Sequence, residues 1–255
     1  MLSLFKYREL IKNLVSKDLK LKYRDSMLGF LWSLANPLLL IVVYSFVFGH
    51  ILRDGPANFA YYLMVGILPW NFFAQSLMMA TSSIVDNGSL IRKVALPLEV
   101  FPVGTVLFNL AQFLLALVIF FPMAFFLFKV SPAWSWLVFP LVLAMQVLFM
   151  LGLCFIVSMA TVFYRDVRHF MEIFLTLLFW LTPIVYDLKM VPDSFRTIVY
   201  FNPFTYYVLA YHDLLFYNAP PTIERLAAIL LLSLVSVGVG YSLFIAYKVR
   251  FTEEV

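Results

Sequence analysis

The stretch 103–128 reads VGTVLFNLAQFLLALVIFFPMAFFLF and contains no Lys, Arg, Asp, Glu or His. A helix needs roughly 20 mainly apolar residues to cross about 30 Å of hydrocarbon. A stretch of this length, with Asn109 and Gln112 as its only amide side chains, therefore predicts a helix that spans a membrane.

The rest of the chain has a composition that fits the same environment. Of its 255 residues, 64% are hydrophobic and 13% are charged, whereas soluble domains are about a quarter charged. Its mean hydropathy is +0.94. We expect an all-α polytopic membrane protein, a single domain over 1–255, with six transmembrane helices at about 30–52, 59–85, 103–128, 133–163, 172–188 and 225–247.

The distribution of Lys and Arg predicts the orientation of these helices. With six spans and the N-terminus inside, thirteen of the 18 basic residues lie in cytoplasmic segments and five lie outside. Cytoplasmic loops of membrane proteins carry an excess of Lys and Arg. We therefore predict that both termini are cytoplasmic.

Two segments outside the spans have patterns of their own. Residues 4–22 place apolar side chains on one arc and most basic ones on the other, which predicts an amphipathic helix in the membrane interface. This helix either only orients the first span or also docks a partner. Prolines cut the segment 189–220 into apolar pieces too short to span, which predicts interfacial or re-entrant helices on the outer side. The second piece would begin at Pro203, with Asn202 as its cap.

Patterns for catalysis and metal binding are missing from the sequence. The three histidines are far apart and Cys154 is the only cysteine, so we predict no metal site. The predicted spans have essentially no charged interior residues, which disfavours a proton-coupled carrier. The cluster YRDVRH, 164–169, is more typical of helix-end ion pairs than of a catalytic group. Since no GxxxxGK phosphate loop occurs either, we expect no enzymatic activity and an external source of energy for any active transport. The net charge of +4 is spread along the chain and indicates no nucleic-acid partner.

The loop between the second and third predicted spans reads DNGSLIRKVALPLEVFP, 86–102. A short helix over 90–95 would end before Pro97 and would be capped by one of three residues, Asp86, Asn87 or Ser89. Its apolar side chains would anchor it, while Arg92 and Lys93 would face the cytoplasm. Such a helix is either a lever that receives a partner's motion or a turn held at the lipid headgroups.

Four segments of the chain resemble the permease subunits of ABC-2-type exporters, in particular those of O-antigen and related polysaccharides. They carry the motifs of that family in the expected order. The segments are KDLKLKYRDSMLGFLWSLANPLL (17–39), NGSLIRKVALP (87–97), VFYRDVRH (162–169), and LTPIVYDLKMVP (181–192) followed by NPFTYYV (202–208).

The resemblance implies a homodimer in the cytoplasmic (inner) membrane, with a channel between the protomers. It implies a lipid-linked polysaccharide as cargo and a place in lipopolysaccharide biosynthesis. A separate nucleotide-binding ATPase subunit would bind ATP and Mg, so this chain would hold no cofactor. The loop 87–97 would be the coupling helix on that ATPase, with the candidate contacts Asn87, Ser89, Leu90, Ile91, Arg92 and Lys93.

Aromatic side chains are candidates for the path of a sugar polymer, because ring faces meet sugar C–H groups through many weak contacts. Phe, Trp and Tyr make up 18% of the chain, although helix packing and lipid contact also use aromatics. Our channel candidates are Trp32, Tyr44, Trp180 and Tyr186. Our outer-gate candidates are Tyr200, Tyr206, Tyr207 and Tyr211. Arg165 and Arg168 would either hold the anionic head of a lipid-linked substrate or only follow the positive-inside rule.

The favoured function is therefore the membrane permease of an ATP-driven exporter of lipid-linked polysaccharide. An ABC-2 permease for a small molecule or drug is the first alternative. A membrane-embedded enzyme of glycan or lipid assembly is the second, and it would need an acidic or His cluster. A subunit that only scaffolds an ATPase is the third.

Overall fold

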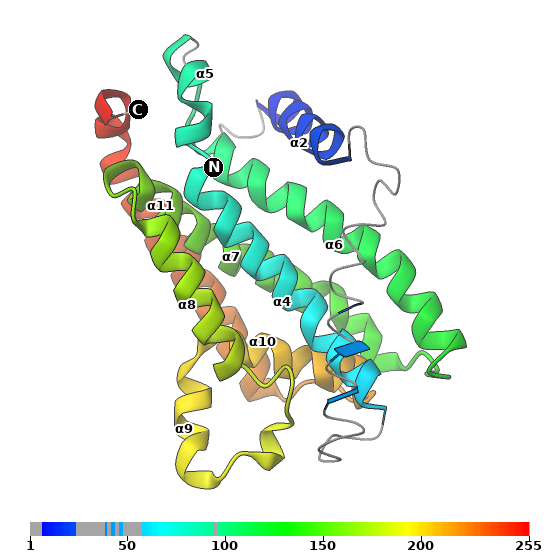
Figure 1. The fold of residues 1–255 in the computed structure, drawn as a ribbon. Helices are drawn as coiled ribbons and strands as arrows, with labels where there is room; N and C mark the ends of the chain where they lie inside the picture. The colour runs from blue at the N-terminus through cyan, green and yellow to red at the C-terminus, as the bar shows by residue number, and fades with distance from the viewer. Residues whose placement is uncertain are drawn as a thin grey trace.

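The computed structural model describes residues 7–23, 39, 42–43, 46–47, 58–93 and 96–254. Every regular element in this part of the chain is helical, as the sequence predicts. The termini of the described chain and the short helix α5 (Gly88–Lys93) lie at one end of the molecule, and α9 (Asp193–Phe201) lies at the opposite end (Figure 1).

Four helical segments are long and apolar enough to cross a membrane. They belong to α4 (Phe59–Ser82), α6 (Val100–Phe126), α7 (Phe139–Phe163) with the preceding turn Trp134–Val138, and α11 (Ile223–Glu254). The apolar patterns over 59–85, 103–128, 133–163 and 225–247 predict these four segments to within a few residues. The other two predicted spans, 30–52 and 172–188, are not among these four segments.

The predicted span 30–52 lies mostly outside the described residues. The predicted span 172–188 is a shorter helix, α8 (Val167–Leu181), which starts five residues earlier and ends seven earlier. It ends because Thr182 is extended, with ψ of 134°, as the residue before Pro183 prefers. With 15 residues, α8 is shorter than the roughly 20 that cross hydrocarbon. The six-span count thus stays a prediction, and the described residues contain four helical segments long and apolar enough to span.

Helix α4 runs through the middle of the bundle, between α6 and α8 (Figure 1), and also packs on α7. Its buried face carries large aromatics, and the ring centroids of Phe73 and Phe204 lie 4.1 Å apart. One amide joins three helices: the Gln146 side chain donates to the Pro69 carbonyl (3.0 Å) and accepts from the Tyr211 hydroxyl (2.6 Å). Hydrogen-bonded polar groups of this kind fix helix positions where lipid offers no partner.

Helices α7 and α11 pack against each other along most of their length. Small residues meet at this contact, and a Cβ on Gly152 would lie 2.2 Å from the Ser236 carbonyl oxygen. The hydroxyls of Ser233 and Ser236 donate to the carbonyls of Met145 and Phe149, at 2.7 and 2.8 Å. Small residues let membrane helices approach closely, because dispersion contact replaces the hydrophobic effect there.

The segments outside the long helices follow the predicted pattern in part. Helix α2 (Arg8–Tyr23) matches the interface helix expected over 4–22, and it packs on α6. Helix α10 (Pro203–Tyr211) begins at Pro203, and the Asn202 side chain caps it by accepting from the Phe204 amide at 3.0 Å. Both α10 predictions are confirmed. The passage of α9 and α10 into a bilayer and back stays a prediction.

Candidate transport site and coupling segment

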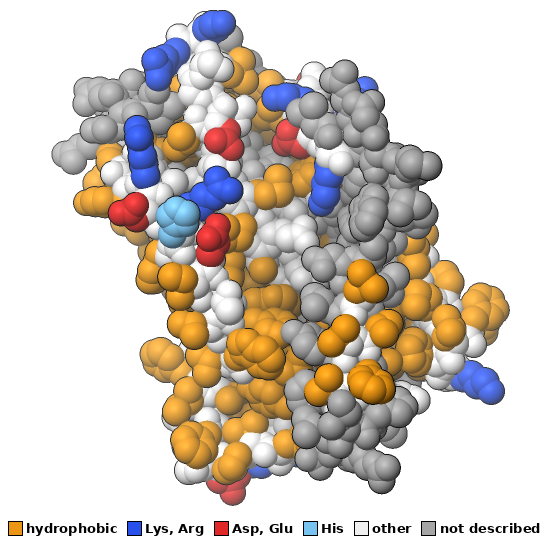
Figure 2. All heavy atoms as spheres, viewed as in Figure 1, with side chains coloured by type: hydrophobic (Ala, Val, Ile, Leu, Met, Phe, Trp, Pro, Cys, Tyr) orange, Lys and Arg blue, Asp and Glu red, His pale blue; other side chains and the backbone are white. Residues whose placement is uncertain are grey.

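Helix α8 has one packed face and one unpacked apolar face. Met171, Leu175 and Leu178 are buried, whereas Ile173 and Leu177 expose 64% and 60% of their surface. Exposed apolar side chains cover the end of the molecule near α9, and charged side chains gather near α5 and α2 (Figure 2). The charged end is therefore the one suited to water and lipid headgroups.

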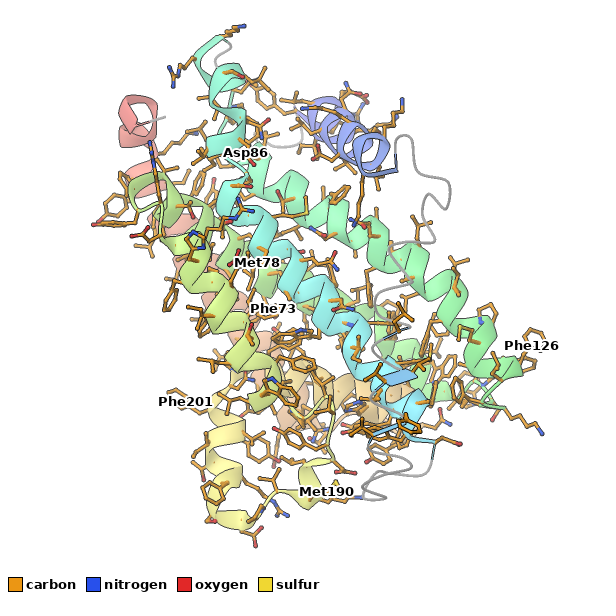
Figure 3. The ribbon with its side chains drawn as sticks, in the orientation of Figure 1. Phe73, Met78, Asp86, Phe126, Met190 and Phe201 are labelled. Atoms are coloured by element: carbon orange, nitrogen blue, oxygen red, sulfur yellow. The ribbon has the colours of Figure 1, made fainter. Side chains whose placement is uncertain are left out.

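A pocket of about 480 Å³ lies between α4 and α8. We call it the α4/α8 pocket. On each helix the residues that line the pocket recur every three or four positions, which is the spacing of one helical face. The lining residues are Ile67, Trp70, Asn71, Ala74 and Met78 from α4, and Glu172, Leu175, Thr176, Phe179 and Trp180 from α8. Met78 points from α4 toward this side of the bundle (Figure 3).

The α4/α8 pocket combines aromatic rings with a few polar groups. Trp70 and Phe179 meet edge to face at 5.5 Å, and Trp180 lies next to Phe179 at 5.4 Å. The polar lining comes from Asn71, Glu172 and Thr176. An apolar pocket with a small number of polar groups is the usual form of a ligand site.

Glu172 is a lining residue that our sequence analysis missed, because it stands at the edge of the predicted span 172–188. Its carboxylate lies 3.6 Å from Nδ1 of His169, and both side chains are more than half exposed. The sequence spacing could have identified it, because Glu172, Thr176 and Trp180 are each four residues apart and so share one helix face.

The four channel candidates lie in different places. Trp180 lines the α4/α8 pocket and is 52% exposed. Tyr186 is half-buried, and its hydroxyl donates to the Trp180 carbonyl at 3.2 Å. The Tyr186 carbonyl in turn accepts from the Tyr62 hydroxyl at 2.9 Å, so Tyr186 ties the end of α8 to α4. Trp32 and Tyr44 lie outside the described residues.

The four outer-gate candidates fall into two groups. Tyr200 is exposed on α9, and its ring lies 5.9 Å from that of the half-buried Tyr206. Tyr207 and Tyr211 are fully buried in the core. The Tyr207 hydroxyl shares a hydrogen bond with Ser233 (2.8 Å), so these two tyrosines connect α10 to α11 and α7.

The predicted coupling loop forms a 3₁₀ turn, Val85–Asn87, followed by α5, which starts two residues before the predicted helix. The Asn87 amide donates to the Ser83 carbonyl at 2.8 Å, so it holds the preceding turn. Among the candidate contacts, Ser89, Arg92 and Lys93 are exposed, whereas Leu90 and Ile91 are half-buried. This division of basic and apolar side chains is the one that the sequence predicts.

The apolar side of this loop packs on a second, smaller core. Leu90 and Ile91 lie against the buried residues Ile84, Leu98, Phe101, Phe155, Val162 and Phe244. These residues come from α6, α7, α11 and the loop itself. A displacement of α5 therefore acts on three long helices at once, because a close-packed core transmits strain.

An ion pair also joins this loop to the C-terminal helix. The ammonium of Lys248 on α11 lies 2.8 and 3.0 Å from the two carboxylate oxygens of Glu99, which precedes α6. The Glu99 side chain is only 8% exposed. The two residues are 149 positions apart, so no local sequence pattern predicts the pair.

Two further basic sites lie at the charged end. Arg165 and Arg168 are exposed at the turn between α7 and α8. Lys22 of α2 donates to Gln112 of α6 and lies 5.8 Å above the Phe108 ring. Burial lowers the pKa of Lys22.

No cluster of His, Cys, Asp and Glu able to hold a metal occurs in the described part of the chain.

Long apolar helices, an amphipathic helix at the charged end and a pocket between two helices together define an integral membrane protein of the transporter class. The chain belongs to the ABC-2 type transporter family, whose model matches residues 9–216. It is thus a transporter membrane subunit and not an enzyme.

Curated relatives match nearly the whole chain. An O-antigen export system permease protein RfbA of Myxococcus xanthus is 34% identical over 254 residues, or 99% of this chain and 97% of the relative. A protein of the same name from Klebsiella pneumoniae is 33% identical over 246 residues, or 96% of this chain and 94% of the relative.

Proposed function

We propose that this chain is the permease of an ATP-driven exporter that moves a lipid-linked polysaccharide of the O-antigen type across the cytoplasmic membrane. The observation that carries this proposal is the α4/α8 pocket, whose aromatic rings and polar groups suit a sugar chain. Ring faces hold the C–H faces of sugars through weak contacts, and amide, hydroxyl and carboxylate groups bond their hydroxyls. The names of the full-length relatives support the same cargo.

The pocket has the properties that sliding requires. Its polar groups are few and stand beside aromatic rings, so each sugar unit makes many weak contacts instead of a few strong ones. Because Ile173, Leu177 and Trp180 leave the outer face of α8 unpacked, a second copy of the chain has an apolar surface to cover. We therefore place the polysaccharide between two protomers, with the α4/α8 pocket of each facing the path.

Energy enters at α5 in this proposal. Exposed Arg92 and Lys93 offer charge to an ATPase subunit, and half-buried Leu90 and Ile91 pass its motion to the core below. ATP and Mg are bound by that subunit. The charged end with α5 and α2 is then cytoplasmic, as are both termini, and α9 is on the outer side of six spans. This orientation follows the excess of Lys and Arg near α5 and α2.

The test is a deletion strain that carries the chain in trans. The position of the lipid-linked polysaccharide is measured in spheroplasts with a glycosidase that cannot cross the membrane. We expect the polysaccharide to accumulate in a protected, inner location without the chain, and to become accessible when the chain is supplied. An unchanged polysaccharide distribution, together with altered sensitivity to small toxic compounds, would favour the small-molecule permease instead.

A further inference from the structure

A second pocket, of about 390 Å³, lies beside α9 at the end of the molecule opposite α5. We call it the α9 pocket. Four segments build it: the connection after α8, α9 itself, α10 through Leu209, and the stretch from the π-helical turn His212–Phe216 to the start of α11. Its planar polar and aromatic side chains are Asp187, Arg196, Tyr200, Asp213, Tyr217 and Arg225.

The charged groups around the α9 pocket are already paired. Arg225 bonds to Asp213, and Arg196 lies 2.6 Å from Asp193. The remaining carboxylate, Asp187, accepts from the Tyr217 hydroxyl at 2.6 Å. The third cation, Lys189, lies 5.4 Å above the Tyr217 ring. The lining holds three cations and two carboxylates, and the third carboxylate, Asp193, pairs with Arg196 from outside the lining. The lining and this partner together carry no net formal charge.

The paired groups keep hydrogen-bonding capacity toward the pocket. A guanidinium has five N–H donors and a carboxylate has about four acceptor positions, so Arg225 and Asp213 do not exhaust each other with one bond. Burial and the bond to Asp187 raise the pKa of the Tyr217 hydroxyl, so it stays protonated. Its one hydrogen goes to Asp187, and its oxygen remains able to accept a hydrogen bond from a ligand. Tyr200 and Tyr217 are 38% and 43% exposed, which leaves ring surface for a ligand.

Fixed donors and acceptors beside ring faces, with no net charge, match a neutral sugar. Adjacent hydroxyls of a pyranose donate to a carboxylate and accept from a guanidinium, and its C–H face packs on an aromatic ring. The volume lies within the range of small-ligand pockets. We propose that the α9 pocket is a saccharide-binding subsite that holds a neutral sugar unit of the cargo at the exit end. This inference rests on the proposed export of polysaccharide.

The test uses site-resolved crosslinking on the purified permease–ATPase complex. The probe is a neutral repeat-unit oligosaccharide, released from the producing cell's own surface polysaccharide and coupled to a diazirine. Labelled peptides are identified by mass spectrometry. We expect labels within 187–200 and 213–225, and at least a fivefold lower yield there with Tyr200→Ala or Asp187→Asn.

Two exposed residues outside the pocket give matched controls. Phe195→Ala removes a ring from the same helix, at a side chain that is 58% exposed, and Glu224→Gln removes a carboxylate beside Arg225. Both should label as the wild type does, and Tyr200→Phe should restore most of the yield lost with alanine. Equal labelling in all variants, no labelling at these peptides, or stronger labelling by an acidic oligosaccharide would overturn the subsite.

Export by the same preparation separates the two proposals. If lipid-linked polysaccharide is exported in an ATP-dependent way but the α9 pocket is not labelled, the subsite is wrong and the proposed function stands. If no polysaccharide is exported, the proposed function fails as well, and the subsite fails with it.

Discussion

Gly152 of α7 and Gly240 of α11 lie in backbone contact. A Cβ placed on Gly240 would lie 2.1 Å from the Gly152 carbonyl oxygen and 2.8 Å from its Cα, closer than real Cβ atoms come. The neighbouring Gly238 has nothing within 4 Å of the same position. The two helices therefore approach to a distance that only glycine permits, and this contact holds α11 against the bundle.

Gly240→Ala should destabilise the protein. The added methyl forces the helices apart, and overpacking of this kind costs about 1–3 kcal/mol. A lower midpoint of thermal unfolding in detergent would be the signature. Gly238→Ala is the control: it should be neutral or slightly stabilising, because glycine within a helix costs roughly 0.5–1 kcal/mol relative to alanine. Equal midpoints for the two variants would contradict the close contact.

Lys248→Met should lower stability more than the double change Glu99→Gln with Lys248→Met. The single change leaves the buried Glu99 carboxylate without its partner, and an unsatisfied buried group costs about 1–3 kcal/mol. The double change removes the unpaired charge. A double-mutant cycle on thermal stability should therefore give a coupling energy of about 1 kcal/mol or more. Strictly additive effects of the two changes would show that the Glu99–Lys248 ion pair does not contribute to stability.

Changing both Arg92 and Lys93 to Glu should abolish co-purification of the ATPase subunit with the tagged chain. The two side chains are exposed on α5, so the reversal alters the surface and leaves the half-buried Leu90 and Ile91 in place. Lys129→Glu, an exposed basic residue near the far end of α6, is the control and should keep the ATPase bound. Equal ATPase recovery from all three proteins would remove α5 from the interface.

Trp180→Ala should reduce polysaccharide export by about twofold to twelvefold, since an aromatic contact contributes about 0.5–1.5 kcal/mol. Phe126→Ala is the matched control. Its side chain is 75% exposed at the far end of α6, points away from the bundle (Figure 3) and does not line the pocket. Export is measured per molecule of folded complex. Wild-type export by Trp180→Ala would exclude this ring from the path.

Hydropathy predicts the four long helices because lipid imposes one simple demand, an apolar stretch with its backbone bonds satisfied inside the helix. Local chemistry predicts the start of α10, where Asn202 and Pro203 act within one turn. The early end of α8 could also have been predicted, because Thr182 precedes Pro183 and such a residue prefers an extended backbone. Apolar residues continue beyond Pro183, so hydropathy alone extended the predicted span to 188.

Features that depend on tertiary contact were not predictable. Tyr207 and Tyr211 read as gate candidates because the sequence places them in an outer segment, yet Ser233 and Gln146 from other helices satisfy their hydroxyls in the core. Glu99 meets Lys248 across most of the chain length. Pairing of this kind follows from helix packing, which the apolar pattern alone leaves undetermined.

Reconstitution into liposomes with the ATPase tests polysaccharide export most directly. Lipid-linked polysaccharide is added to the outer leaflet, with α5 and the ATPase facing the medium, and its protection from an added glycosidase is followed. We predict that protection rises with ATP, stays at background without it, and is lost when Arg92 and Lys93 are changed to Glu. Protection that never exceeds background, while ATP is hydrolysed and the Arg92–Lys93 variant behaves like the wild type, would contradict polysaccharide export through this chain.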